Sequence, residues 1–67
     1  MLLHALPDDG LEAGDVGTVV HLYGDGTGVE VEFLTGDGAT VAVITLSLDE
    51  VRALGHGDVL HVRPLAA

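Results

Sequence analysis

The side chains with the clearest capacity for chemistry are four histidines, His4, His21, His56 and His61. Histidine is a common zinc ligand, so these residues suggest a metal site. No two of them have the i, i+4 or His-x-His spacing that gathers ligands within one element. Only His21 and His61, on two separately predicted strands, could meet beside a carboxylate. Scattered surface histidines explain the pattern better, and we expect no metal site.

The acidic residues form a second group. Glu30 and Glu32 are two positions apart in an alternating segment, so both point to one face of a predicted strand. Such a pair can serve acid–base catalysis, but on a solvated strand face it is more often solubilising. Asp25 and Asp37 lie in glycine-rich loops that lack the spaced ligands of a calcium loop. We interpret these two aspartates as turn residues.

Nucleophilic catalysis has little support in the sequence. The chain contains no cysteine, which removes both a strong nucleophile and any cysteine-based zinc site. Ser47 is explained as the N-cap of a helical turn, with Glu50 three residues later in a capping-box pattern. The glycine-rich segment 24–28 lacks a lysine and precedes a strand, so it is not a phosphate-binding loop. We therefore expect neither enzyme activity nor a cofactor.

The charge balance limits the partners. Eleven acidic residues against two basic ones give a net charge of −9 over 67 residues. Two arginines cannot neutralise the phosphates of a nucleic acid or an anionic membrane, so we predict that the protein binds neither. The acidity is consistent with simple solubility and, alternatively, with a basic protein partner. A signal peptide and an apolar run of membrane-spanning length are both missing from the sequence, so we expect a cytoplasmic protein.

Short alternating or β-branched segments separated by glycine-rich turns are typical of an all-β fold. Strands are predicted over residues 2–6, 16–23, 29–33, 40–46 and 59–63, and a helical turn over 47–51. We predict one domain over residues 1–67, a small five-stranded SH3-like barrel with the helical turn just before the last strand. Gly17 suggests a bulge or a bend in the second of these strands. The predicted core contains Val16, Val20, Leu22, Val29, Val31, Phe33, Ile44, Leu46 and Val51.

Three segments carry a resemblance to a known family. Residues 6–20 contain Leu-Pro-Asp-Asp-Gly-Leu followed by Gly-Asp-Val-Gly-Thr-Val-Val, residues 30–33 read Glu-Val-Glu-Phe, and residues 38–46 end in Thr-Leu. In these segments the chain resembles an uncharacterised family of short bacterial proteins with an SH3-like barrel. The resemblance implies an antitoxin- or immunity-type partner of a small toxin-like protein.

The sequence thus predicts a non-catalytic protein-binding module that masks a basic, toxin-like protein through an acidic face. The alternative is an accessory or scaffold barrel that stabilises or matures a larger enzyme. Aromatic and acidic residues around the first hairpin provide the candidate binding surface. Its residues are Tyr23, Asp25, Glu30, Glu32, Leu34 and Asp37. We also expect a homodimer, formed by strand pairing or by apolar faces around Val41, Val43 and residues 59–62.

Overall fold

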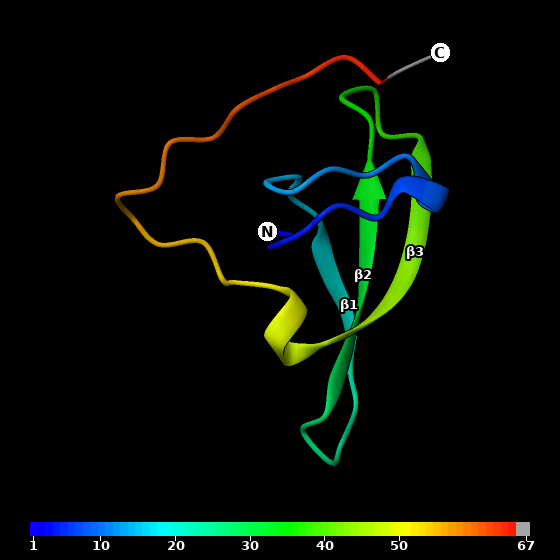
Figure 1. Cartoon of the computed structure of the whole chain (residues 1–67), viewed down its shortest axis with the longest axis vertical. Coiled ribbons are helices and arrows are strands. Elements are labelled where there is room, and N and C mark those ends of the chain that lie inside the picture. Colours follow the sequence, from blue (N-terminus) through cyan, green and yellow to red (C-terminus); the bar gives the residue numbers. More distant parts are fainter. Residues whose placement is uncertain (66–67) are drawn as a thin grey trace.

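Three antiparallel strands dominate the computed structural model, which describes residues 1–65 (Figure 1). They are β1 (Thr18–Leu22), β2 (Gly28–Leu34) and β3 (Thr40–Ser47). The strands form one sheet in the order β1-β2-β3, so β2 is central and the other two are edges. Two 3-10 turns, η1 (Pro7–Asp9) and η2 (Leu48–Glu50), complete the regular structure. The predicted all-β class is confirmed, and no helix in residues 1–65 has the length and apolarity to cross a membrane.

Two short loops connect the strands, and each is closed by the turn chemistry that the sequence predicts. In the first, the Gly26 amide donates to the Tyr23 carbonyl oxygen at 3.0 Å, and Gly26 has a φ of 74°. In the second, the Gly38 amide donates to the Thr35 carbonyl oxygen at 2.9 Å, and Gly38 has a φ of 88°. Glycine is favoured at both positions because a side chain would be strained in this left-handed region. The local sequence therefore favours both turns.

The core lies on one face of this sheet, against the N-terminal segment. Val29, Val31 and Phe33 alternate along β2 and are at most 5% exposed. Leu46 from β3 packs with them, and Leu2 and Leu11 cover them from the other side. The predicted core residues Ile44 and Val51 are half-buried at its margin.

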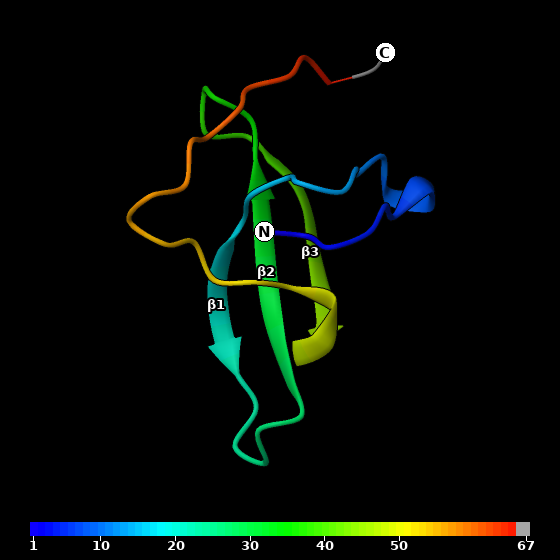
Figure 2. The same cartoon turned by 60° about the vertical axis from the view of Figure 1, so that its left-hand side comes forward.

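Residues 1–3 are held in this covering layer by backbone hydrogen bonds to two distant segments. On one side the Leu2 amide donates to the Asp15 carbonyl oxygen at 2.9 Å. On the other side the Leu3 amide donates to the Glu50 carbonyl oxygen at 3.0 Å, and the Arg52 amide to the Met1 carbonyl oxygen at 2.9 Å. The start of the chain therefore lies between residues 14–15 and residues 50–52, across the inner face of the sheet (Figure 2).

The capping box at η2 fixes the turn that leads into this layer. The Ser47 amide donates to Glu50 Oε1 at 2.9 Å, and the Ser47 hydroxyl lies 2.8 Å from the same oxygen. The Glu50 carboxylate also contacts His4 Nε2 at 3.1 Å. These hydrogen bonds, above all the one from the Ser47 amide, lower the pKa of Glu50. The predicted helical turn and its cap are confirmed.

The predicted five-stranded barrel is not formed by residues 1–65, which make an open sheet of three strands. Residues 2–6 contribute only isolated bridges, from Leu2 to Val51 and from Leu6 to Leu11. Residues 59–63 have no regular structure. The prediction that Val16, Val20 and Leu22 are buried is wrong, because they are 39%, 52% and 68% exposed. They lie along or just before β1, an edge strand that no further strand covers in the described chain.

Gly17 is required for close packing rather than for a bulge. A Cβ atom on Gly17 would lie 2.5 Å from Val31 Cγ1 and 2.8 Å from the Glu32 carbonyl oxygen. The chain therefore passes directly against β2 just before β1 begins. The irregularity in β1 instead lies between Val19 and His21. The sequence predicted a bulge or a bend at Gly17, and the structure has its register shift three residues later, at Val20.

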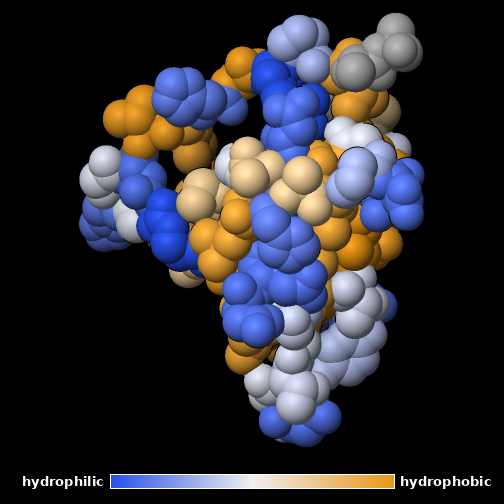
Figure 3. All heavy atoms as spheres, viewed as in Figure 1, coloured by the Kyte–Doolittle hydropathy of each residue, from blue (hydrophilic) through white to orange (hydrophobic). Residues whose placement is uncertain are grey.

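The last described segment, residues 53–65, extends away from the sheet, and we call it the C-terminal strap. Figure 3 shows open space between the strap and the rest of the molecule. In its middle, Asp58 accepts a hydrogen bond from Arg52 at 3.0 Å. Near its end, Arg63 donates to both carboxylate oxygens of Asp15, at 2.8 and 2.5 Å. Ion pairs thus hold the strap at two points, Asp58 and Arg63.

Candidate functional site

The candidate binding residues Glu30 and Glu32 lie on the outer face of β2, opposite the core. In the sheet register, Glu30 pairs with His21 on β1 and Thr45 on β3, and Glu32 pairs with Thr18 and Val43. Paired residues point to the same face, so a carboxylate-bearing strand is flanked on both sides by polar or small apolar side chains. Because β2 is central, both glutamates are half-buried rather than fully exposed.

Each glutamate accepts a hydrogen bond from a neighbouring hydroxyl group. The Tyr23 hydroxyl donates to Glu30 Oε1 at 3.0 Å, and the Thr40 hydroxyl donates to Glu32 Oε2 at 2.8 Å. The Tyr23 ring is also in edge-to-face contact with the His21 ring, with centroids 4.8 Å apart. These contacts orient the two carboxylates and leave their other oxygens available to a donor from outside.

The remaining candidates lie toward the two ends of β2. Asp25 is in the β1–β2 loop with Tyr23, whereas Asp37 is in the β2–β3 loop, just beyond Leu34. Successive loops of an antiparallel meander lie at opposite ends of the sheet, so Asp25 and Asp37 do not share one cluster. The structure therefore brings Tyr23 and Glu30 together and divides the aspartates between the two ends of the face.

Both loop aspartates accept hydrogen bonds from residues of their own turns. Asp25 accepts from the Thr27 hydroxyl at 2.8 Å and from the Thr27 amide at 3.1 Å, and these bonds lower the pKa of Asp25. Asp37 accepts from the Thr35 hydroxyl and the Ala39 amide, which likewise lower the pKa of Asp37. Hydrogen bonds to a carboxylate favour its charged form, so both loops carry a fixed negative charge. This arrangement agrees with their interpretation as turn residues.

The positive charges of the chain lie elsewhere. Arg52 pairs with Asp58, while Arg63 pairs with Asp15 and, at 3.4 Å, with Glu12. Within residues 1–65, neither Glu30 nor Glu32 forms an ion pair. The outer face therefore keeps its negative charge unneutralised by the protein's own arginines.

A shallow hollow of about 370 Å³ adjoins the Tyr23 end of the outer face. Tyr23, Asp25 and Thr27 line it from the first hairpin, and Thr45 and Ser47 line it from the end of β3. The hollow is open and polar on its rim, with one carboxylate and several hydroxyl groups.

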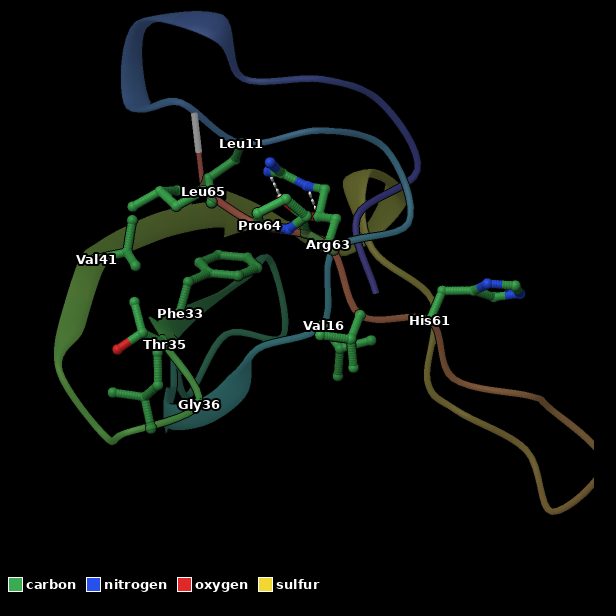
Figure 4. Close-up of a pocket in the computed structure, with 13 residues that line it drawn as sticks. Leu11, Val16, Phe33, Thr35, Gly36, Val41, His61, Arg63, Pro64 and Leu65 are labelled. Carbon is green, nitrogen blue, oxygen red and sulfur yellow. Dashed lines mark hydrogen bonds and ion pairs between the residues drawn. The ribbon is translucent and has the colours of Figure 1, made fainter. Parts of the chain in front are cut away.

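A second hollow, of about 440 Å³, lies beneath the C-terminal strap. Phe33, Val41 and Leu11 line it from the body, and Pro64 and Leu65 line it from the strap. Figure 4 shows Pro64 over the Phe33 ring and His61 pointing away from the hollow. Its lining is mainly apolar and contains no pair of groups arranged for catalysis. Among residues 1–65, no three histidine, aspartate or glutamate side chains are grouped to hold a metal ion.

Several contacts on the outer face were not predicted from the sequence. The Thr40 hydroxyl donates to Glu32, although strand propensity alone accounts for a threonine at this position of the sequence. The register of the second hairpin provides the missing signal, because Thr40 and Glu32 are eight residues apart across its loop. The pairing of Arg63 with Asp15, 48 residues away, has no comparable local signal.

Comparison with known proteins gives one match. No curated protein and no solved structure matches the chain at a significant level. Residues 1–53 match the model of a family described as a domain of unknown function, DUF4926. This match covers the sheet, both hairpins and the N-terminal layer, and it ends where the C-terminal strap begins. The chain therefore belongs to the DUF4926 family.

Proposed function

We propose that the protein is a non-catalytic binding module whose outer sheet face binds a basic protein. The observation that supports this most directly is the distribution of charge. Arg52 is paired with Asp58 and Arg63 with Asp15, whereas Glu30 and Glu32, on the outer face, have no ion-pair partner among residues 1–65. A lysine or arginine of the partner would form ion pairs with these carboxylates, and it would not have to displace an arginine of this chain.

The side chains around the glutamates favour arginine-rich recognition. Tyr23 is 38% exposed and offers a ring face beside the Glu30 carboxylate. A guanidinium can stack on such a ring while it donates to the adjacent carboxylate. The hollow between Tyr23, Asp25 and Thr45 gives room for a third contact from the same partner. Leu34 and Val43, about half exposed, add apolar area to the same face.

Within this class we propose an antitoxin- or immunity-type role, in which the acidic face masks a basic site on a toxin-like protein. Its support is the resemblance described for residues 6–20, 30–33 and 38–46, together with the small size and the charge of −9. We further propose a bacterial, cytoplasmic protein whose sheet is the main part of an SH3-like barrel. The position of η2 directly after the third strand supports that fold proposal.

The first test is to examine whether a small basic protein is encoded beside this gene, to co-express that protein with this chain, and to measure their affinity. We expect a complex that weakens as salt increases, because the attraction is between opposite charges. Glu30→Lys combined with Glu32→Lys should weaken it by about tenfold or more. Asp8→Lys with Asp9→Lys is the matched control, since it makes the same charge change at the exposed η1 turn.

The control distinguishes a binding face from a general effect of net charge. Equal weakening by both double variants would contradict a specific outer-face site, and unchanged affinity in the glutamate variant would remove the mechanism. A growth assay addresses the role itself. Rescue of cells from the partner's toxicity supports the antitoxin role, whereas altered activity of a larger enzyme would support the accessory-barrel alternative.

A further inference from the structure

A strand-like segment and an open strand edge occur in the same chain without pairing. Residues 59–62 are Val-Leu-His-Val, and Val59, Leu60 and Val62 are 82%, 60% and 99% exposed. Across the described chain these four residues form no backbone hydrogen bond with the body; the only backbone bond made by the strap is from Asp58 to Gly55. Three large apolar side chains in water and free backbone groups are together an unstable surface.

The edge strand β1 presents the complementary surface. Within residues 1–65, β1 pairs only with β2, so its other edge has unpaired amide and carbonyl groups. Val19, Val20 and Leu22 on this strand are between 51% and 68% exposed. An added strand would pair with these backbone groups and cover the valines and the leucine.

The strap does not pair with β1 of its own chain, and it is held to other segments at two points. Asp58 is bound to Arg52, and Arg63 is bound to Asp15 and to the Gly10 carbonyl oxygen at 3.2 Å. Between these two points, Val59, Leu60 and His61 face residues 13–16 across a gap of about 300 Å³. Residues 13–16, which lead into β1, therefore lie beside the strap but do not pair with it as strands of a sheet do.

We propose that a second copy of this chain supplies the missing pairing: residues 59–62 of each copy add to the open edge of β1 in the other. Such an exchange is isologous, since each copy gives one strand and receives one. It covers the two exposed apolar segments at once. It also supplies the last strand of the proposed SH3-like barrel from the partner copy.

Charge explains why two chains of −9 can meet at this surface. Residues 16–24 contain no Asp, Glu, Lys or Arg, and neither do residues 59–62. Their contact places no carboxylates opposite each other, whereas the outer face would bring Glu30 and Glu32 against their counterparts. The remaining long-range repulsion is screened by salt, so this association strengthens with ionic strength. The proposed complex with a basic protein weakens instead, which keeps the two proposals distinguishable.

The first measurement is the mass of the full-length protein by light scattering over a range of concentrations and salt. We expect a dimer that is favoured by concentration and by salt. Amide hydrogen exchange then locates the contact. Protection should rise with concentration in β1 and in residues 59–62, while β3 should not change. A chain that stays monomeric under all conditions overturns the proposal.

Variants test the residues directly. Val59→Asp with Val62→Asp should weaken dimerisation by at least about tenfold, because pairing would desolvate the new carboxylates. Both positions are so exposed that the fold of each copy should be unaffected, which circular dichroism checks. Leu3→Asp with Leu48→Asp is the matched control, since it adds the same two carboxylates at exposed leucines outside both surfaces.

Three further results would each contradict the proposal. Unchanged dimerisation in the double variant excludes residues 59–62 from the contact. Protection of β1 that is independent of concentration indicates that the strap closes on its own chain. Protection that appears along β3 indicates that the other edge, near Val41 and Val43, is the interface.

Discussion

The body of the molecule, residues 1–52, and the C-terminal strap are stabilised in different ways. The body buries Val29, Val31, Phe33, Leu46, Leu2 and Leu11 and links its two layers by backbone hydrogen bonds. The strap, despite a similar supply of valine and leucine, buries none of its described residues and is attached by ion pairs. Apolar composition alone therefore does not decide burial; a segment also needs a surface within reach.

The boundary of the family match agrees with this division. The match ends at residue 53, the first residue of the strap. The part of the chain that matches the family model thus corresponds to the packed body. Substitutions in the body should affect unfolding of the whole domain, while substitutions in the strap should affect mainly its attachment.

The largest expected loss of stability comes from a substitution in the core of the body. Phe33→Ala removes an aromatic side chain that is 3% exposed and should cost about 3–5 kcal/mol of unfolding free energy. That is comparable to the total stability expected for a small domain. Urea denaturation followed by circular dichroism measures the loss. Leu34→Ala, at the neighbouring exposed position, is the control and should change stability by no more than about 0.5 kcal/mol; a similar loss in both variants would contradict this core.

An intermediate effect is expected where the chain passes against β2. Gly17→Ala places a methyl group against the Glu32 carbonyl oxygen and Val31, so the backbone must move, at a cost of about 1–3 kcal/mol. The thermal unfolding temperature of this variant is compared with that of a control variant. Gly24→Ala is the control, because a Cβ at Gly24 has no atom within 4 Å and its φ is not positive. If the two alanine variants unfold at the same temperature, the close approach of Gly17 to β2 is incorrect.

The smallest effect is expected at the attachment of the strap. The hydrogen bond from Arg63 is the main cause that lowers the pKa of Asp15 below its ordinary value of 3.8. The unfolded chain therefore takes up a proton first as the pH falls, and the contribution of Asp15 to stability is present above pH 3.8 and lost below it. Asp15→Asn should destabilise the protein modestly at pH 6 and have no effect once Asp15 itself is protonated.

The rate of protease cleavage within the strap, measured at pH 6 and in acid, reports how firmly the strap is attached. Asp8→Asn, at an exposed position without an ion pair in the described chain, controls for the loss of one charge. A difference between Asp15→Asn and the parent protein that persists undiminished in acid would show that the ion pair is not its cause.

The same comparison explains what the sequence could predict. Alternation in residues 29–33 predicted β2 and its buried face correctly, because that pattern is local. Alternation in residues 59–63 predicted a strand as well, but a strand also requires a partner edge, and no local pattern specifies one. The pairing of Arg63 with Asp15, 48 residues apart, depends on the path of the whole chain and was not predictable.

Within the candidate site, residues that are close in the sequence are the ones that meet in the structure. Tyr23 and Glu30 face each other across one hairpin, and their seven-residue separation follows from the loop. The placement of Asp25 and Asp37 at opposite ends of β2 follows from the meander of three strands. The hydroxyl donors were missed because threonine is equally common in strands that bind nothing.

The position of residues 1–3 between residues 14–15 and 50–52 also has a consequence for the order of folding. A ribosome releases the N-terminal residues first, and both hairpins can form from local contacts once residue 47 is free. The covering layer is complete only when Met1 pairs with Arg52, 51 residues later, so the inner face of the hairpins is not fully covered until that residue has emerged. During this interval the valines of β2 are open to association with other nascent chains, and the yield of folded protein should depend on how quickly synthesis passes residue 52.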